Sequence, residues 1–151
     1  MPAEFIRPPR ATRHCRHYSY ETGIQGRGAM CALGIDLSSP GAWYACSPDP
    51  KGECAKRENY TDEERASWKV WLDASIERLG KAVLALPAPI PLRTSGKVKC
   101  PNCETGELHY ARWHRGAEIQ CSTPNCCGPV HFSIAAGTNW PSGGGRDADQ
   151  P

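Results

Sequence analysis

Two closely spaced groups of cysteines in the C-terminal third constrain this chain more than any other feature. The first is Cys100-Pro-Asn-Cys103, and after seventeen intervening residues the run Cys121-Ser-Thr-Pro-Asn-Cys126-Cys127 begins. Two cysteines separated by two residues can direct both sulfurs to one tetrahedral zinc ion. The spacing therefore predicts a closed four-thiolate zinc site. Its ligands are Cys100, Cys103, Cys121 and either Cys126 or Cys127, because adjacent cysteines rarely both reach one ion.

The residues between these cysteines have the pattern of a β-hairpin. Glu107 to Trp113 and Ala117 to Cys121 are predicted strands, and His114-Arg115-Gly116 is the turn between them. Gly106 follows the first cysteine pair, where we expect a residue that tolerates positive φ. A hairpin held by two cysteine pairs is a zinc ribbon.

The run GELHYARWHRGAEIQCSTPNCCG resembles the zinc ribbons at the C-terminus of bacterial type I topoisomerases. Those ribbons have a C-P-x-C pair, a Gly-x-Leu strand, a basic turn and a C-S-x-x-P-x-C segment. The likeness covers about thirty residues. It implies contacts with single-stranded DNA, and it implies Cys127 as the fourth ligand, whereas spacing alone leaves Cys126 equally open.

Metal is expected to replace much of the apolar core. Leu, Ile, Val and Phe supply only 21 of 151 residues, and the chain has nine cysteines. The N-terminal residues include four arginines and no apolar run, so we expect no signal peptide. No apolar stretch approaches the length of a membrane span, so we expect no span and a cytoplasmic location. In a reducing compartment, cysteines are more often metal ligands than disulfides.

A second metal site is predicted in the segment from residue 15 to residue 60. Its cysteines are Cys15, Cys31, Cys46 and Cys54, at long and irregular spacings within a loop-rich region. Four thiolates can hold such a region around zinc, which is the first choice, or around an iron–sulfur cluster. A mixed site that includes His14 or His17 is the third alternative.

The same cysteines carry a second resemblance, to small proteins of bacteriophages and prophages. The matching residues are Cys15, the run Cys31-Ala-Leu-Gly34-Ile-Asp36, Cys46, Cys54 and the run Tyr60-Thr61-Asp-Glu-Glu64. The resemblance implies an origin in a mobile element. The host cytoplasm would then be the location, and a host protein complex would be one class of partner.

One amphipathic helix is predicted from residue 61 to residue 86. Thr61 and Glu64 form a capping box, and Pro87 ends the helix. An apolar stripe runs along it, and the N-terminal metal module is the surface that we expect it to cover. Gly80 marks a bend or a close contact. The alternatives for the stripe are a dimer seam and a partner site that includes Trp68 and Trp71.

Aromatic and basic residues predict nucleic-acid binding, with single strands preferred. In the hairpin, aromatic side chains that can stack on bases alternate with cations that can contact phosphates. In the N-terminal arm, arginines recur at every third residue, as suits an extended chain along a phosphate backbone. The hairpin residues are Tyr110, Arg112, Trp113, His114 and Arg115, and the arm residues are Arg7, Arg10, Arg13 and Arg16.

The charge balance limits this prediction. The formal net charge is +2, and each zinc ion with four thiolates carries a total of about −2. Strong non-specific nucleic-acid binders normally present a basic stripe, and only the arginine arm supplies one. No catalytic motif is present, and a zinc ion with four thiolates has no open position for water, so we expect no enzymatic activity.

The sequence thus predicts a small, metal-stabilised α+β protein whose role is binding. Nucleic acid is the first class of partner, and a host protein complex or a structural place in an assembly is the alternative. The expected parts are a basic arm (1–14), a cysteine-rich metal module (15–60), the helix (61–86), a proline-rich linker (87–96), the zinc ribbon (97–136) and a disordered tail (137–151).

Overall fold

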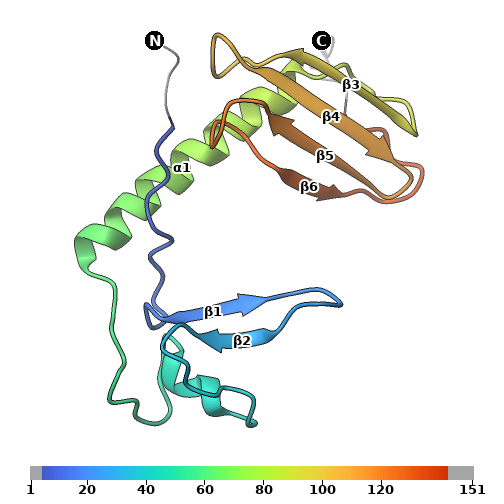
Figure 1. Ribbon diagram of the computed structural model, residues 1–151. Coiled ribbons are helices and arrows are strands. Elements are labelled where there is room, and N and C mark those ends of the chain that lie inside the picture. The colour runs from blue at the N-terminus through green and yellow to red at the C-terminus, as the bar shows by residue number, and fades with distance from the viewer. Residues whose placement is uncertain (1–4, 143–151) are drawn as a thin grey trace, which may run out of the picture. The chain divides into compact units, whose positions relative to one another are not determined.

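The computed structural model describes residues 5–142 and shows one α-helix and two antiparallel sheets, which confirms the α+β class (Figure 1). The order of elements is β1 (Tyr18–Glu21), β2 (Gly28–Cys31), the 3-10 helix η1 (Ala42–Cys46), α1 (Asp62–Ala85), β3 (Thr94–Lys99), β4 (Glu107–Trp113), β5 (Gly116–Cys121) and β6 (Val130–Ser133). Within the described residues, no helix is both long and apolar enough to cross a membrane.

The chain divides into two compact units. The N-terminal unit comprises residues 8–70, and the C-terminal unit comprises residues 71–142 together with residues 5–7 of the described chain. The boundary therefore falls inside α1, between Val70 and Trp71. The sequence placed the helix in a segment of its own, whereas each unit includes a part of it.

The N-terminal unit consists of a short hairpin and long loops. Strands β1 and β2 pair antiparallel, with Tyr18 opposite Cys31 and Glu21 opposite Gly28. The buried cluster is small and contains Cys15, Leu37 and Cys46. A unit with so few buried aliphatic residues depends on other interactions to remain folded.

The predicted capping box is present at the start of α1. The Thr61 N–H donates to Glu64 Oε2 at 2.7 Å, and the Glu64 N–H donates to Thr61 Oγ1 at 3.1 Å. Arg16 adds a bidentate contact, with its two terminal nitrogens 2.9 and 2.6 Å from the Glu64 oxygens. This pair fixes the segment that precedes β1 to the first turn of the helix.

The later part of α1 packs against the C-terminal unit. Leu79, Ala82 and Val83 contact the core that contains the second group of cysteines. We expected the apolar stripe to cover the N-terminal metal module. These three residues instead cover the core of the C-terminal unit. Leu72 and Ile76 remain 42% and 61% exposed.

The C-terminal sheet has four strands in the order β3-β4-β5-β6, all antiparallel. The two predicted strands correspond to β4 and β5. Strand β3 begins at Thr94, inside the expected linker, and the preceding Ile90 is 4% exposed in the same core. Residues 90–96 are thus part of the sheet unit and not a spacer in front of it.

The expected disordered tail is also folded in part. Trp140 packs on Phe132 with 5.0 Å between ring centroids, and its carbonyl accepts a hydrogen bond from the Ile90 N–H at 2.9 Å. Residues 137–142 are therefore attached to the sheet. The rest of the predicted tail, residues 143–151, lies outside the described residues.

Candidate metal centre

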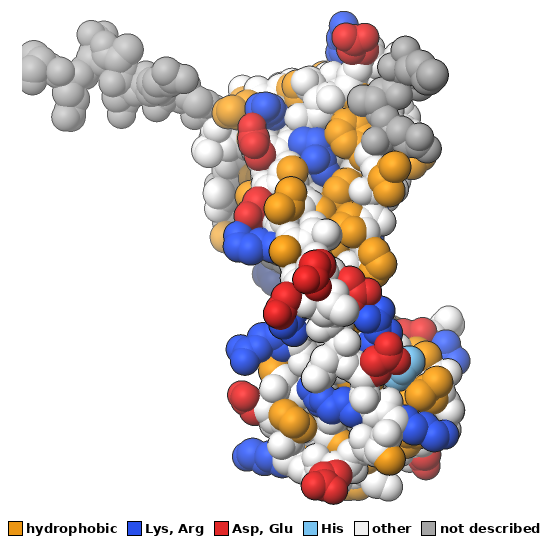
Figure 2. Space-filling view, turned by 90° about the vertical axis from the view of Figure 1, so that its left-hand side faces the viewer, with side chains coloured by type: hydrophobic (Ala, Val, Ile, Leu, Met, Phe, Trp, Pro, Cys, Tyr) orange, Lys and Arg blue, Asp and Glu red, His pale blue; other side chains and the backbone are white. Residues whose placement is uncertain are grey.

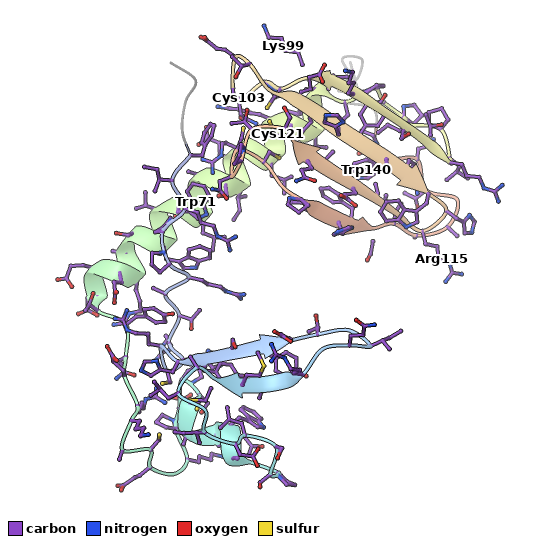
Figure 3. All side chains as sticks on the ribbon, in the orientation of Figure 1. Trp71, Lys99, Cys103, Arg115, Cys121 and Trp140 are labelled. Carbon is purple, nitrogen blue, oxygen red and sulfur yellow. The ribbon has the colours of Figure 1, made fainter. Side chains whose placement is uncertain are left out.

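Four buried cysteines converge at one end of the C-terminal sheet. Cys100 and Cys103 come from the turn after β3, Cys121 ends β5, and Cys126 lies in the loop before β6. Their sulfur atoms all lie within 4.8 Å of one another. The Sγ–Sγ distance is 3.8 Å between Cys100 and Cys126 and 3.5 Å between Cys103 and Cys121. Figure 3 shows Cys103 and Cys121 beside α1, at the opposite end of the β4–β5 hairpin from Arg115.

This geometry fits a zinc ion. Zn–S bonds of about 2.3 Å in a tetrahedron separate the sulfurs by about 3.8 Å. The observed separations lie near that value and far above the bond length of about 2.05 Å in a disulfide. The four cysteines are free and at most 7% exposed. The cluster can therefore hold a metal ion, and its thiolates suit zinc and other thiophilic metals.

Backbone amides point at two of the sulfurs. The Asn102 N–H lies 3.4 Å from Cys100 Sγ, and the Thr123 N–H lies 3.4 Å from Cys121 Sγ. In both turns the donor is two residues after the cysteine, so the two halves of the cluster have the same local geometry. Such N–H groups stabilise negative charge on sulfur, as a metal thiolate requires.

Burial makes four thiolates unfavourable without a cation. It raises the pKa of Cys121 and Cys126, and the neighbouring thiols raise the Cys126 pKa further. At Cys103 burial acts in the same direction, but hydrogen bonds with Thr123 and the neighbouring thiols outweigh it and lower the pKa to about 7. A bound divalent cation would offset the charge that burial penalises.

Gly106 leaves room for two of the sulfurs. A Cβ at this position would lie 2.6 Å from Cys103 Sγ and 2.7 Å from Cys121 Sγ. The expected positive φ is wrong, since Gly106 is not among the residues with that conformation. Close packing against the thiols requires glycine here, and its carbonyl also accepts the Cys100 N–H at 3.0 Å.

The structure places Cys126, and not Cys127, in the four-cysteine group. Cys127 is buried beside it, and burial raises its pKa to about 11. Its backbone carbonyl accepts the Cys121 N–H at 2.8 Å, so Cys127 closes the loop through its main chain. The topoisomerase resemblance implied Cys127 as the fourth ligand, whereas the residue that joins the group is Cys126, one position earlier.

Arg78 of α1 connects the helix to the cysteine loop, which sequence reasoning missed. Its Nε donates to the Cys126 carbonyl at 2.7 Å. The guanidinium lies over the rings of Phe5 and Trp71, 4.9 and 4.8 Å from the ring centroids. In return, Asn102 Nδ2 donates to the Arg78 carbonyl at 2.8 Å. The only signal in the sequence was a cation seven residues, or two helical turns, after Trp71.

The four N-terminal cysteines line one cavity of about 160 Å³. Burial raises the pKa of Cys46, and the charges of Cys15, Cys31 and Cys54 raise it further. Among the described residues, however, no three of their sulfurs meet the 4.8 Å spacing that the C-terminal group satisfies. Of the alternative ligands, His14 stacks on Tyr18, whereas His17 lines the cavity and contacts Glu58 at 3.1 Å.

The predicted nucleic-acid residues of the hairpin divide between two faces of the sheet. Trp113 is 41% exposed, and His114 and Arg115 are exposed in the β4–β5 turn. Tyr110 packs against the core. Arg112 is 3% exposed and donates to the carbonyls of Trp113, Gly116 and Thr138, so its guanidinium is used within the fold. We predicted that Arg112 contacts a phosphate, whereas its guanidinium is buried and bonded to backbone carbonyls.

The arginines of the arm also differ from one another. Arg10 and Arg13 are exposed, whereas Arg16 is held by Glu64 and contacts Glu58 at 3.2 Å. Arg7 lines a hollow beside α1. The expectation that four guanidinium groups follow one face of an extended arm does not hold for Arg16. Of the predicted partner residues, Trp71 stacks with Arg78, and Trp68 is half-buried.

Comparisons with known proteins identify no relative: no family model matches the chain, and neither a curated protein nor a solved structure matches it.

Proposed function

We propose that the C-terminal unit is a zinc ribbon whose structural zinc is held by Cys100, Cys103, Cys121 and Cys126, and that the protein is a binding module without enzymatic activity. The observation that carries this proposal is the buried group of four sulfurs within 4.8 Å of one another. All four zinc positions would be occupied by thiolates, which leaves none for a reacting water.

We further propose that the ribbon binds single-stranded nucleic acid at the end of the hairpin. Trp113 lies across Gly116, where a Cβ would come within 2.5 Å of Trp113 Nε1, and its ring centroid is 6.4 Å from that of His131. An exposed indole on a rigid hairpin can stack on an unpaired base, and Arg115 in the adjacent turn can contact the phosphate. His114 lies in the same turn.

The charge around this surface favours moderate affinity. Glu118 lies 3.5 Å from His131, whose ring neighbours Trp113, and at the other end of β4 Glu107 pairs with Lys97 at 2.8 Å. Figure 2 shows the side of the chain away from the hairpin end, and there too positive and negative side chains are interspersed. Stacking therefore contributes more of the proposed affinity than a broad basic surface would.

The test is a titration of the zinc-loaded full chain with short single-stranded DNA, single-stranded RNA and duplex DNA at two salt concentrations. We expect tighter binding to single strands, weakening as salt rises, and at least a ten-fold loss of affinity in Trp113→Ala. Trp140→Phe is the matched control for loss of an indole that packs against the core, and it should leave affinity unchanged. Absence of binding at low salt by a zinc-loaded chain would contradict nucleic-acid binding and leave the zinc ribbon intact.

A protein partner is the second candidate, and an apolar hollow of about 270 Å³ in the C-terminal unit favours it. Leu72 and Ile76 of α1 line it together with Val130, and the two helical side chains are exposed. The phage resemblance suggests a host complex as the partner. Binding that is insensitive to salt and lost in Ile76→Asp would favour this role over the first.

A further inference from the structure

The loops of the N-terminal unit bring four cysteines from distant positions to one cavity. Cys15 precedes β1, Cys31 ends β2, Cys46 ends η1 and Cys54 lies in the following loop. Cys15 and Cys46 are 5% and 6% exposed, and Cys31 and Cys54 are half-buried. All four cysteines of this unit face the same space, although 38 residues lie between the first and the last.

Three of these cysteines begin a tight turn. The N–H of the residue three positions later bonds to the cysteine carbonyl at 3.0 Å in each case: Tyr18 to Cys15, Gly34 to Cys31, and Arg57 to Cys54. Gly34 has φ of +78°, which lets the chain reverse after Cys31. The Cys15 N–H also bonds to the Cys46 carbonyl at 2.9 Å, which joins two of the cysteine segments directly.

Arg57 fixes the backbone around the cavity. Its guanidinium donates to the carbonyls of Ala45 at 2.6 Å, Ser47 at 3.0 Å and Arg13 at 3.4 Å. These residues flank Cys46 and lie two positions before Cys15. One side chain therefore holds the segments that carry two of the four thiols.

We propose that Cys15, Cys31, Cys46 and Cys54 form a second metal centre, which holds a thiophilic metal through four thiolates. The centre is separate from the proposed zinc ribbon and does not depend on it. Its sulfurs are spaced more widely than those of the C-terminal group, since among the described residues no three of them meet that group's 4.8 Å spacing. Its occupant is either an iron–sulfur cluster, which can be held by thiolates that lie farther apart, or a zinc ion toward which the cysteine side chains rotate.

The experiment is an anaerobic titration of the reduced, metal-free full chain with Co²⁺, which gives intense thiolate charge-transfer bands. We expect saturation at two equivalents in the wild type, and at one in both Cys54→Ser and Cys126→Ser. Cys127→Ala removes a buried cysteine outside both groups and should retain two. Loss of a site in Cys54→Ser tests this proposal, whereas loss in Cys126→Ser tests the zinc ribbon.

Alkylation of the wild type supplies a test that needs no variant. Metal should protect all four N-terminal cysteines from iodoacetamide, and a chelator should expose them, as peptide mass spectrometry can measure. The natural occupant follows from metal analysis of anaerobically purified protein, in which iron with acid-labile sulfide indicates a cluster and two zinc ions indicate zinc. Saturation at one equivalent of Co²⁺ in a protein that is purified without iron and acid-labile sulfide, or N-terminal cysteines that metal leaves unprotected, would overturn the proposal.

Discussion

At the scale of single residues, Gly106 shows how a correct residue can be predicted for the wrong reason. The sequence suggested a turn that needs positive φ, which Gly106 does not have. In the structure two sulfur atoms pack so closely on the Gly106 backbone that a Cβ there would lie only 2.6 and 2.7 Å from them. Conformation can be inferred from local sequence, but contact with Cys121 arises only when β5 returns to the first cysteine pair.

Gly106→Ala is therefore expected to weaken zinc binding by at least ten-fold, because the added methyl group displaces Cys103 and Cys121. Competition with a chromophoric chelator measures the change. Gly80→Ala is the matched control: Gly80 has nothing within 4 Å of its hypothetical Cβ, so alanine should stabilise α1 by about 1 kcal/mol. Equal zinc affinity in Gly106→Ala and the wild type would contradict the packing interpretation.

Arg78 provides the second prediction at this scale. Arg78→Lys keeps the charge but loses the planar guanidinium that stacks on two rings and donates to Cys126. We expect the free energy of unfolding of the zinc-loaded protein to fall by about 1–3 kcal/mol, measured with a chemical denaturant. Lys81→Ala, which removes an exposed ion pair with Glu77, should change it by less than about 0.5 kcal/mol. Similar effects of the two substitutions on the free energy of unfolding would contradict the stabilising role of the Arg78 guanidinium.

At the scale of elements, the start of α1 predicts a dependence on pH. The hydrogen bonds from Arg16, followed by the Thr61 N–H, lower the pKa of Glu64 from 4.5 to about 2. A lowered pKa in the folded state means that ionised Glu64 stabilises the fold fully above about pH 4.5. This contribution is lost as pH falls towards 2.

Denaturant unfolding at several pH values, with the wild type compared to Glu64→Gln, isolates this contribution. The difference in unfolding free energy should be constant above pH 4.5 and shrink below it. Glu63→Gln controls for the loss of one negative charge in the same helical turn. A difference between wild type and Glu64→Gln that does not change between pH 6 and pH 3 would contradict the role of Glu64.

The elements that sequence predicted are those with local signals. The helix, β4 and β5 were found because capping residues, periodicity and a turn lie within each segment. Strands β3 and β6 were missed because prolines and glycines around them suggested a linker and a loop. Their strand structure comes from pairing: Lys97 with His109, and Val130 with Ile119.

At the scale of the whole molecule, the small apolar core predicts dependence on metal. Removal of the proposed zinc from the C-terminal unit should leave four buried thiols and only a few fully buried side chains, such as Leu108 and Ile119. We expect a chelator to accelerate amide hydrogen exchange throughout β3 to β6, as measured by mass spectrometry. Cys126→Ser should give the same result without a chelator, and unchanged protection in both cases would contradict a structural metal.

The sequence by itself determined the cysteine pairs, the capped helix and the central hairpin, because each depends on residues close together in the chain. The tertiary structure decided that Cys126 joins the cluster, that Arg78 contacts its loop and that Arg112 is buried. These outcomes depend on how the loop after β5 meets β3 and α1. The local spacing of Cys126 and Cys127 is nearly the same, so only the fold could distinguish the two.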